Sequence, residues 1–163
     1  MRERSFRVRV TKDYLKFSAA HFIAYKGFRE RLHGHNYRVS VEVQGKTLGR
    51  EGYLLDFGLL KGIARAVCNT LDEKVVIPVH SDCLRTRAEG GQIIVLYEND
   101  EFRFPAADVA LLPIKHSSAE ELARYVASEV RRALAQRARG RINALEIGIE
   151  ETSGQTAFFR EQG

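Results

Sequence analysis

One stretch of alternating side chains constrains the fold of this chain more than any other feature. Within residues 33–44, every second side chain is a histidine, tyrosine or valine, and mostly polar residues stand between them. The residues that share this parity are His33, His35, Tyr37, Val39, Val41 and Val43. Side chains two residues apart point to the same face of a β-strand, so the pattern predicts a strand with one buried face.

Two further strands are predicted on the same grounds. Residues 5–12 alternate, and arginines separate Phe6, Val8 and Val10. The phase slips near Asp13, which predicts a bulge or a bend. After the slip, one face is shared by Leu15, Phe17, Ala19 and His21. The last predicted strand has an inward-facing set of the same kind, formed by Leu145, Ile147, Ile149 and Glu151.

Apolar residues at helical spacing predict two helices. The first follows Asp56, a good N-cap residue. Its apolar stripe consists of Leu59, Leu60, Ile63, Val67 and Leu71. The second begins at Ser117 or Ser118, because a glutamate follows either serine three residues later, as in a capping box. Its stripe consists of Leu122, Val126, Val130 and Leu134, and Gly140 is expected to end it.

The remaining segments complete an α+β fold. Extended structure is expected at residues 52–55 and 75–80, and a hairpin around Asn99-Asp100 joins residues 92–97 to 101–104. Antiparallel strands with helices on one face are typical of the α+β class. The 163 residues contain no internal repeat and no low-complexity linker, so a single domain over 1–163 is expected.

Composition excludes several classes of function. The net charge is +5, but the basic residues are scattered and form no RNA-binding motif, so no nucleic-acid partner is expected. Cys68 and Cys83 lack the spacing of a thiolate metal site and are interpreted as free thiols. No apolar run approaches the ~18–20 residues that cross a bilayer. The N-terminal segment is charged, so a cytoplasmic location without membrane association is expected.

Three histidines form the most informative constellation. His33 and His35 lie on one face of the same predicted strand, about 7 Å apart along it. Gly34 between them permits a close approach of another backbone. His21 ends the preceding strand and supplies a third imidazole. Three neutral imidazoles with one open position describe a catalytic zinc site rather than a structural one.

The residues around these histidines resemble a known family. FSAAH at 17–21 and LHGHNY at 32–37 are similar to the signature of the 6-pyruvoyltetrahydropterin synthase and 6-carboxytetrahydropterin synthase family. The similarity continues through LLDFGLLK at 54–61, LD at 71–72, SSAEELA at 117–123 and IEET at 149–152. The resemblance therefore covers nearly the whole chain, in the right order.

The resemblance implies a fold, a metal and a substrate. The expected fold is the tunnelling fold, in which a four-stranded antiparallel sheet carries two helices on one face. Subunits join their sheets into an oligomeric barrel, most often a hexamer, with active sites between subunits. The family's zinc ligands correspond to His21, His33 and His35, and its pterin-anchoring glutamate corresponds to Glu151. Ser118 stands near the position of a substrate-contacting serine or threonine.

The chain departs from the family pattern at the catalytic base. Residues 25–31 contain no cysteine, and Glu73 replaces the histidine that usually follows the aspartate at Asp72. Glu30 lies three residues before His33 and resembles a branch in which glutamate replaces the cysteine. His116 is the second candidate for the base, and Asp72 remains a candidate partner. Residues 77–113 are longer than expected and are interpreted as an extended hairpin insertion.

The resulting hypothesis is a zinc-dependent lyase of pterin biosynthesis. Its expected substrate is 7,8-dihydroneopterin triphosphate or a close relative, and the Glu30 branch leaves a 6-hydroxymethyl group. The triphosphate would meet some of Lys26, Arg29 and Arg31. The alternatives are 6-pyruvoyl or 6-carboxy products, or an oligomer that binds zinc and pterin without turnover.

Overall fold

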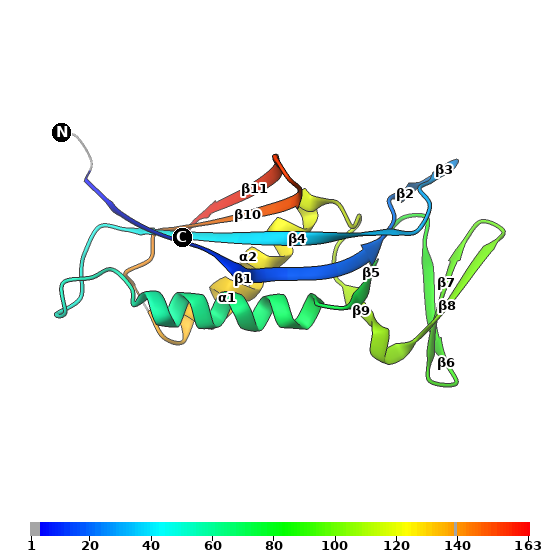
Figure 1. The fold of residues 1–163 in the computed structure, drawn as a ribbon, viewed down its shortest axis with the longest axis horizontal. Coiled ribbons are helices and arrows are strands. Elements are labelled where there is room, and N and C mark those ends of the chain that lie inside the picture. The colour runs from blue at the N-terminus through cyan, green and yellow to red at the C-terminus, as the bar shows by residue number, and fades with distance from the viewer. Residues whose placement is uncertain (1–3, 139) are drawn as a thin grey trace.

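A six-stranded sheet forms the body of the computed structural model, which describes residues 4–138 and 140–163. The strand order is β11-β10-β4-β1-β5-β9 (Figure 1). The strands are β1 (Phe6–His21), β4 (His33–Gly45), β5 (Lys74–Pro78), β9 (Val109–Leu112), β10 (Ala144–Thr152) and β11 (Gln155–Gln162). The four strands from β11 to β1 are antiparallel, as predicted, whereas β5 and β9 add to the edge of β1 in parallel.

The predicted irregularity in β1 is confirmed. The ladder between β1 and β4 runs from Phe6 to Thr11, shifts register, and resumes at Lys16. Val10 before the shift and Leu15 and Phe17 after it are all buried. The bulge therefore restores the inward phase of the strand, so that its last residue, His21, also faces the core side.

Both predicted helices cover one face of this sheet. Helix α1 (Phe57–Leu71) begins after Asp56, whose side chain accepts the Leu59 N–H at 2.8 Å. Helix α2 (Ala119–Ala135) begins after Ser118, which accepts the Glu121 N–H at 3.3 Å. The prediction that Gly140 ends α2 was wrong by one turn. The N–H groups of residues 137 and 138 both bond to the Leu134 carbonyl, which closes the helix earlier.

The main core lies between the helices and the sheet. Its fully buried members include Leu15, Phe17, Tyr37, Val41, Leu60, Leu122 and Ile147. They come from the alternating set of each strand and the apolar stripe of each helix, as the periodicity predicts. The piece at 52–55 is irregular rather than extended, and it buries Leu54 and Leu55 just before α1.

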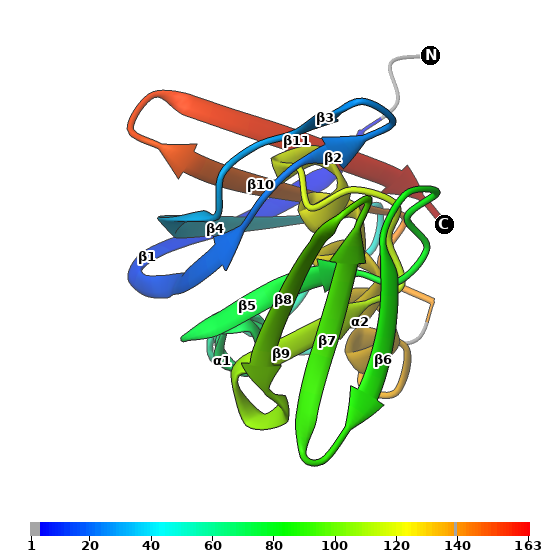
Figure 2. The ribbon, with the colours of Figure 1, turned by 90° about the vertical axis from the view of Figure 1, so that its right-hand side faces the viewer.

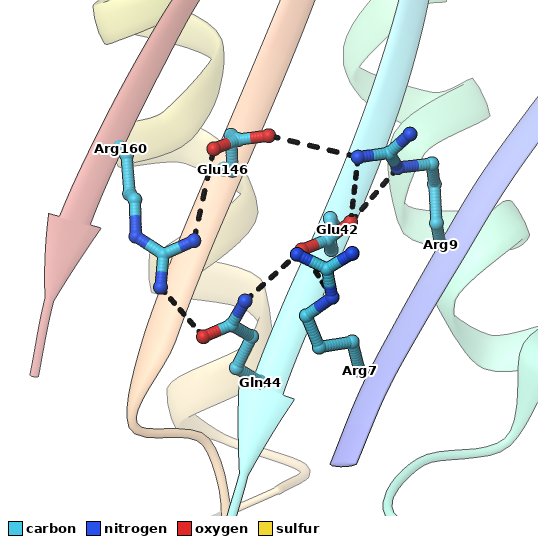
Figure 3. Close-up of polar contacts among 6 residues, drawn as sticks. All are labelled: Arg7, Arg9, Glu42, Gln44, Glu146 and Arg160. Atoms are coloured by element: carbon cyan, nitrogen blue, oxygen red, sulfur yellow. Dashed lines mark hydrogen bonds and ion pairs between the residues drawn. The ribbon is translucent and has the colours of Figure 1, made fainter. Parts of the chain in front are cut away.

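The opposite face of the sheet is polar (Figure 3). The Glu42 side chain on β4 is only 4% exposed, and its carboxylate accepts the Arg9 Nε–H at 2.8 Å. Arg7 lies at 3.5 Å from the same carboxylate, and Arg160 on β11 reaches both Gln44 and Glu146. A carboxylate at this depth needs such partners, because an unpaired buried charge is costly. Cross-strand ion pairs therefore satisfy Glu42 on this face.

A second, three-stranded sheet stands at one end of the molecule (Figure 2). It consists of β6 (Arg85–Glu89), β7 (Gln92–Tyr97) and β8 (Asp100–Pro105), and a short 3-10 helix (Ala106–Asp108) leads from it to β9. The hairpin of β7 and β8 was predicted, whereas β6 was missed because its sequence, RTRAE, lacks an apolar alternation. The chain also forms a small hairpin of β2 (Ala24–Tyr25) and β3 (Phe28–Arg29) at this end.

A separate apolar cluster joins the small sheet to the body of the molecule. Its buried members are Phe22, Ala24, Ile77, Leu84, Ile93, Val95 and Tyr97. The residues that follow the end of β1 are thus packed against β7. In the described ranges, neither helix has the length and apolar character needed to cross a membrane.

Candidate active site

The three histidines converge at the junction of β1 and β4. His21 is the register partner of His33, and His35 pairs with Ala19 one position further along the same face. The ring centroids are 4.7 Å apart for His21 and His33, 5.3 Å for His21 and His35, and 5.0 Å for His33 and His35. One nitrogen of each ring lies within 4.8 Å of the others. The predicted cluster is therefore confirmed as a geometric group.

Backbone carbonyls orient two of the rings. Nδ1 of His21 is 2.8 Å from the Ser117 carbonyl oxygen, and Nδ1 of His33 is 2.7 Å from that of Arg31. A carbonyl oxygen only accepts, so each Nδ1 carries the proton and donates it. The free lone pair of each ring then lies on Nε2. Histidines that bind a metal commonly donate their other ring N–H to a backbone carbonyl in this way.

Burial also favours the form that binds a metal. Burial lowers the pKa of His21 below its ordinary value, and the nearby His33 acts in the same direction. Neutral imidazole is the ligand form, whereas imidazolium cannot coordinate. The Nε2 atoms of His21 and His35 are buried and have no hydrogen-bond partner among the described residues. Three convergent imidazole nitrogens of this kind fit a zinc ion with one open position.

Gly34 permits the close contact of the two strands. A β-carbon at this position would lie 3.1 Å from the Ala19 carbonyl oxygen and 3.7 Å from the Ala20 α-carbon. Since the first is a backbone atom, it cannot rotate away as a flexible side chain does. The absence of a side chain at Gly34 therefore keeps the segment 33–35 close to the segment 19–21.

A cavity of about 380 Å³ opens beside His21 and His33. Small-molecule sites commonly have volumes of ~300–1,000 Å³. Three of the predicted site residues also line it, namely Glu30, Ser118 and Glu151. Most of its wall is polar, which suits a ligand rich in hydrogen-bonding groups rather than an apolar one.

Glu151 lines the cavity and also approaches His35. Its Oε1 atom is 3.5 Å from Nε2 of His35, and its side chain is 28% exposed. The residue sits at a register shift between β10 and β11, which aims the carboxylate toward this end of the sheet. The Tyr37 hydroxyl is nearby, and its pKa is raised first by burial and then by the negative charge of Glu151. Tyr37 therefore stays protonated.

Glu30 approaches the cavity from the loop before β4. Its Oε2 atom accepts the Ile23 N–H at 2.8 Å, and its own N–H donates to the Ile23 carbonyl at 2.9 Å. This double contact closes the loop that begins after β1. The second carboxylate oxygen is not used in that contact, and the side chain is partly exposed.

The other predicted catalytic residues do not line this cavity. Asp72 follows α1 and is exposed, and its Oδ1 accepts the Ser18 N–H at 2.7 Å. His116 is partly exposed and precedes Ser117. The roles of Asp72 and His116 in catalysis stay predictions. Ser118 does line the cavity, and its Oγ serves at the same time as the N-cap of α2.

Sequence reasoning missed several residues of the site. Gln155, Thr156 and Ala157 of β11 form one wall of the cavity, and that strand was not predicted. The turn at Ser153-Gly154 was the available signal, because it follows one strand directly and allows a hairpin. Ser117 was considered only as a helix cap. It is fully buried, and its hydroxyl donates to the Phe22 carbonyl at 3.1 Å.

Comparison with known proteins agrees with this geometry. The family model described as 6-pyruvoyl tetrahydropterin synthase matches residues 9–162. A protein of Methanocaldococcus jannaschii, provisionally named 6-carboxy-5,6,7,8-tetrahydropterin synthase, is 34% identical over 147 residues, which cover 90% of each chain.

Solved structures show the same fold over almost the full length. The 6-pyruvoyl tetrahydropterin synthase of Plasmodium vivax is 34% identical, with a TM-score of 0.91 over 98% of this chain and 99% of that one. The Plasmodium falciparum enzyme is 39% identical, with a TM-score of 0.89 over 97% of this chain and 98% of that one. Two more structures of the P. vivax enzyme carry alanine or cysteine in place of a catalytic glutamate. On these grounds the chain belongs to the 6-pyruvoyl tetrahydropterin synthase family.

Proposed function

We propose that this protein is a zinc-dependent lyase that cleaves the side chain of 7,8-dihydroneopterin triphosphate and leaves a 6-hydroxymethyl group on the pterin. The observation that carries the proposal is that Glu30, His21 and His33 border one cavity in a chain that has no cysteine at residues 25–31. A relative with a catalytic glutamate, the P. vivax enzyme, supports a carboxylate as the base.

Glu151 would hold the pterin ring. A carboxylate can accept two parallel hydrogen bonds from the 2-amino group and the adjacent ring N–H of a pterin. The place of Glu151 in the cavity wall, beside His35, supports this role, because a pterin held there would have its side chain near the histidines. The polar cavity wall near Ser118 would meet the remaining ring edges.

Glu30 would act as the base and then as the acid. His21, His33 and His35 would hold a zinc ion, which would supply Lewis-acid polarisation of the hydroxyls of the substrate side chain. Glu30 takes the proton of the 2′-hydroxyl, the C1′–C2′ bond breaks, and C2′ leaves as the aldehyde that carries the triphosphate. The electron pair passes to C1′ and into the conjugated ring. Return of the proton to C1′ gives the 6-hydroxymethyl group.

Product identification tests the proposal directly. The purified, zinc-loaded protein is incubated with 7,8-dihydroneopterin triphosphate, and the pterin product is identified by chromatography and mass spectrometry. The expected product is 6-hydroxymethyl-7,8-dihydropterin, formed together with a two-carbon aldehyde triphosphate. Formation of a 6-pyruvoyl product instead would contradict the assigned bond cleavage.

The second candidate is 6-carboxytetrahydropterin formation. The provisional name of the M. jannaschii relative favours it. It predicts a 6-carboxy product in the same incubation, so one experiment separates the two. Zinc and pterin binding without any turnover would instead identify a non-catalytic oligomer, in which the lost cysteine and histidine have not been replaced.

We propose that the subunits assemble into a closed ring, most simply a hexamer. Strand β11 ends the sheet order, so its outer edge is unpaired within one chain. An eight-residue edge strand is a liability unless another chain pairs with it. Phe158 on this strand is 60% exposed in the single chain. Sedimentation should show a species several times the 18.5 kDa chain, and a monomer at micromolar concentration would contradict the assembly.

A further inference from the structure

The loop that carries Glu30 is attached to the small sheet by side chains. This loop, residues 22–30, leaves the end of β1, forms the hairpin of β2 and β3, and returns to β4. Its own backbone contacts are few, because β2 and β3 contribute only two residues each. The position of Glu30 therefore depends on what packs against the loop.

Arg29, the residue before Glu30, makes the central contact. Its Nε and Nη2 atoms donate to Oδ2 of Asp100 at 3.0 and 2.6 Å, and Asp100 begins β8. The third guanidinium nitrogen, Nη1, donates to the Glu30 carbonyl at 2.9 Å. One planar group thus joins the small sheet directly to the backbone of the candidate base.

The same guanidinium also lies over two aromatic rings. The Cζ atom of Arg29 is 5.0 Å from the ring centroid of Phe102 and 5.8 Å from that of Phe22. The two rings are stacked, with centroids 5.0 Å apart. An arginine over an aromatic face is stabilised by the ring quadrupole, more so when it is partly removed from water. The Arg29 side chain is only 22% exposed.

Two further bonds connect the loop to the β7–β8 hairpin. The Tyr97 hydroxyl donates to the Tyr25 carbonyl at 3.0 Å, and the Gly27 N–H donates to Oε1 of Glu98 at 3.3 Å. Tyr97 and Glu98 come from the end of β7 and its turn. The hairpin therefore contacts the loop at three successive places, and Arg29 is the one closest to Glu30.

We propose that Arg29 is a positioning residue, which Asp100 of the small sheet holds in place so that Glu30 is set against the substrate side chain. This inference rests on the proposed role of Glu30 as the base. A shift of about 1 Å in a catalytic group lowers the rate by up to about 100-fold, so a loop that holds Glu30 in place would maintain the rate. Arg29 was expected among the candidates for the triphosphate. Its guanidinium instead has protein partners at each of its nitrogens.

The test compares variants of the two partners with a matched control. Asp100→Asn removes the charge from the acceptor, and Arg29→Lys keeps the positive charge but loses the planar fork. Glu101→Gln is the control, because Glu101 is also on β8 and its side chain pairs with the exposed Arg103, its one ion-pair partner among the described residues. Each variant is assayed for kcat, KM, zinc content and thermal midpoint with 7,8-dihydroneopterin triphosphate.

A positioning role predicts a specific pattern. Asp100→Asn and Arg29→Lys should each lower kcat about tenfold, with KM within about twofold of wild type and full zinc content. The double variant should lose little more than either single variant, because both remove one contact. Asp100→Glu should recover part of the rate. Glu101→Gln should behave as wild type.

Other outcomes would overturn the inference. An unchanged kcat in Asp100→Asn would show that the contact does not position Glu30. A raised KM with unchanged kcat in Arg29→Lys would identify Arg29 as a phosphate-binding residue instead. Amide hydrogen exchange gives a readout that does not need turnover. The Ile23 N–H, which bonds to the Glu30 carboxylate, should exchange several-fold faster in Asp100→Asn than in Glu101→Gln. If wild type has no turnover but this difference in exchange appears, the proposed function fails, whereas the conclusion that Asp100 and Arg29 fix the position of Glu30 still holds.

Discussion

Two members of the histidine group, His21 and His33, border the same cavity as Glu30, but the histidines and Glu30 are held in different ways. The histidines belong to β1 and β4, whose residues pair one to one from Lys16–Arg38 to His21–His33. Glu30 belongs to a loop that is held mainly by side chains of a separate small sheet. The candidate metal ligands are thus fixed by the ladder of the main sheet, whereas the base depends on an added element.

This difference has an energetic basis. A central ladder opens only when the body of the protein unfolds, whereas a loop held by side chains opens locally at a lower free-energy cost. Removing one side chain from the ladder face should therefore abolish a function without moving its neighbours. Removing one of the side chains that attach the loop to the small sheet, such as Asp100, should displace Glu30 while the histidines stay in place.

The largest expected effect comes from the histidines. His33→Ala and His35→Ala should each lose most of the bound zinc and all detectable turnover, because two imidazoles cannot replace three in this geometry. The measurement is zinc content after gel filtration, followed by the product assay. His116→Ala is the matched control for metal content, since His116 lies outside the group. Full zinc in both His33→Ala and His35→Ala would contradict the site.

The next effect concerns the base alone. Glu30→Gln keeps the shape of the side chain, and the amide oxygen can still accept the Ile23 N–H. We expect kcat to fall by about 100-fold or more, with zinc and pterin binding unchanged, because the amide cannot take a proton. Stopped turnover together with lost zinc would instead mean a structural role. If Glu30→Gln keeps its rate and His116→Ala does not, the base is His116.

The sequence predicted the parts of the site that a regular period positions. Strand parity alone placed His33 and His35 on one face, and the bulge near Asp13 brought His21 to the same side. The helix cap at Asp56 and a second cap at Ser117 or Ser118 followed from side-chain chemistry within four residues, and the structure selects Ser118. In each case the signal was local, and the tertiary structure agreed with it.

The features that the sequence did not predict depend on contacts between segments that are distant along the chain. The bonds of Arg29 to Asp100 and of Tyr97 to Tyr25 span 71 and 72 residues, and no local period encodes them. Strand β11 was missed because its sequence, QTAFFREQ, has no regular alternation of apolar and polar residues. The two parallel edge strands also depend on a partner strand that is distant in sequence.

A smaller effect is expected at Gly34, where the two strands of the histidine group approach closely. Gly34→Ala should destabilise the protein by about 1–3 kcal/mol, because the new β-carbon would meet the Ala19 carbonyl oxygen. Zinc affinity should fall with it, since the shift separates His21 from His33. Gly62→Ala in α1 is the control. Apart from its chain neighbours and the backbone of its own helix, no described atom lies within 4 Å of the added β-carbon, and alanine there should stabilise the helix by about 0.5–1 kcal/mol. Chemical denaturation and zinc titration measure both variants.

The smallest perturbation uses the two cysteines as probes of the two regions. Cys68 is 1% exposed in α1, and burial raises its pKa to about 12, whereas Cys83 is partly exposed and packs beside the small sheet. Iodoacetamide reacts with the thiolate, which at pH 8 is only about one in ten thousand of the Cys68 population. Mass spectrometry of the native protein should therefore find about one label per chain, on Cys83, and two after denaturation. Cys83→Ser should remove the native label. Equal labelling of Cys68 and Cys83 would mean that the main body opens as readily as the small sheet. The histidines on the main sheet would then be held no more rigidly than Glu30 on its loop.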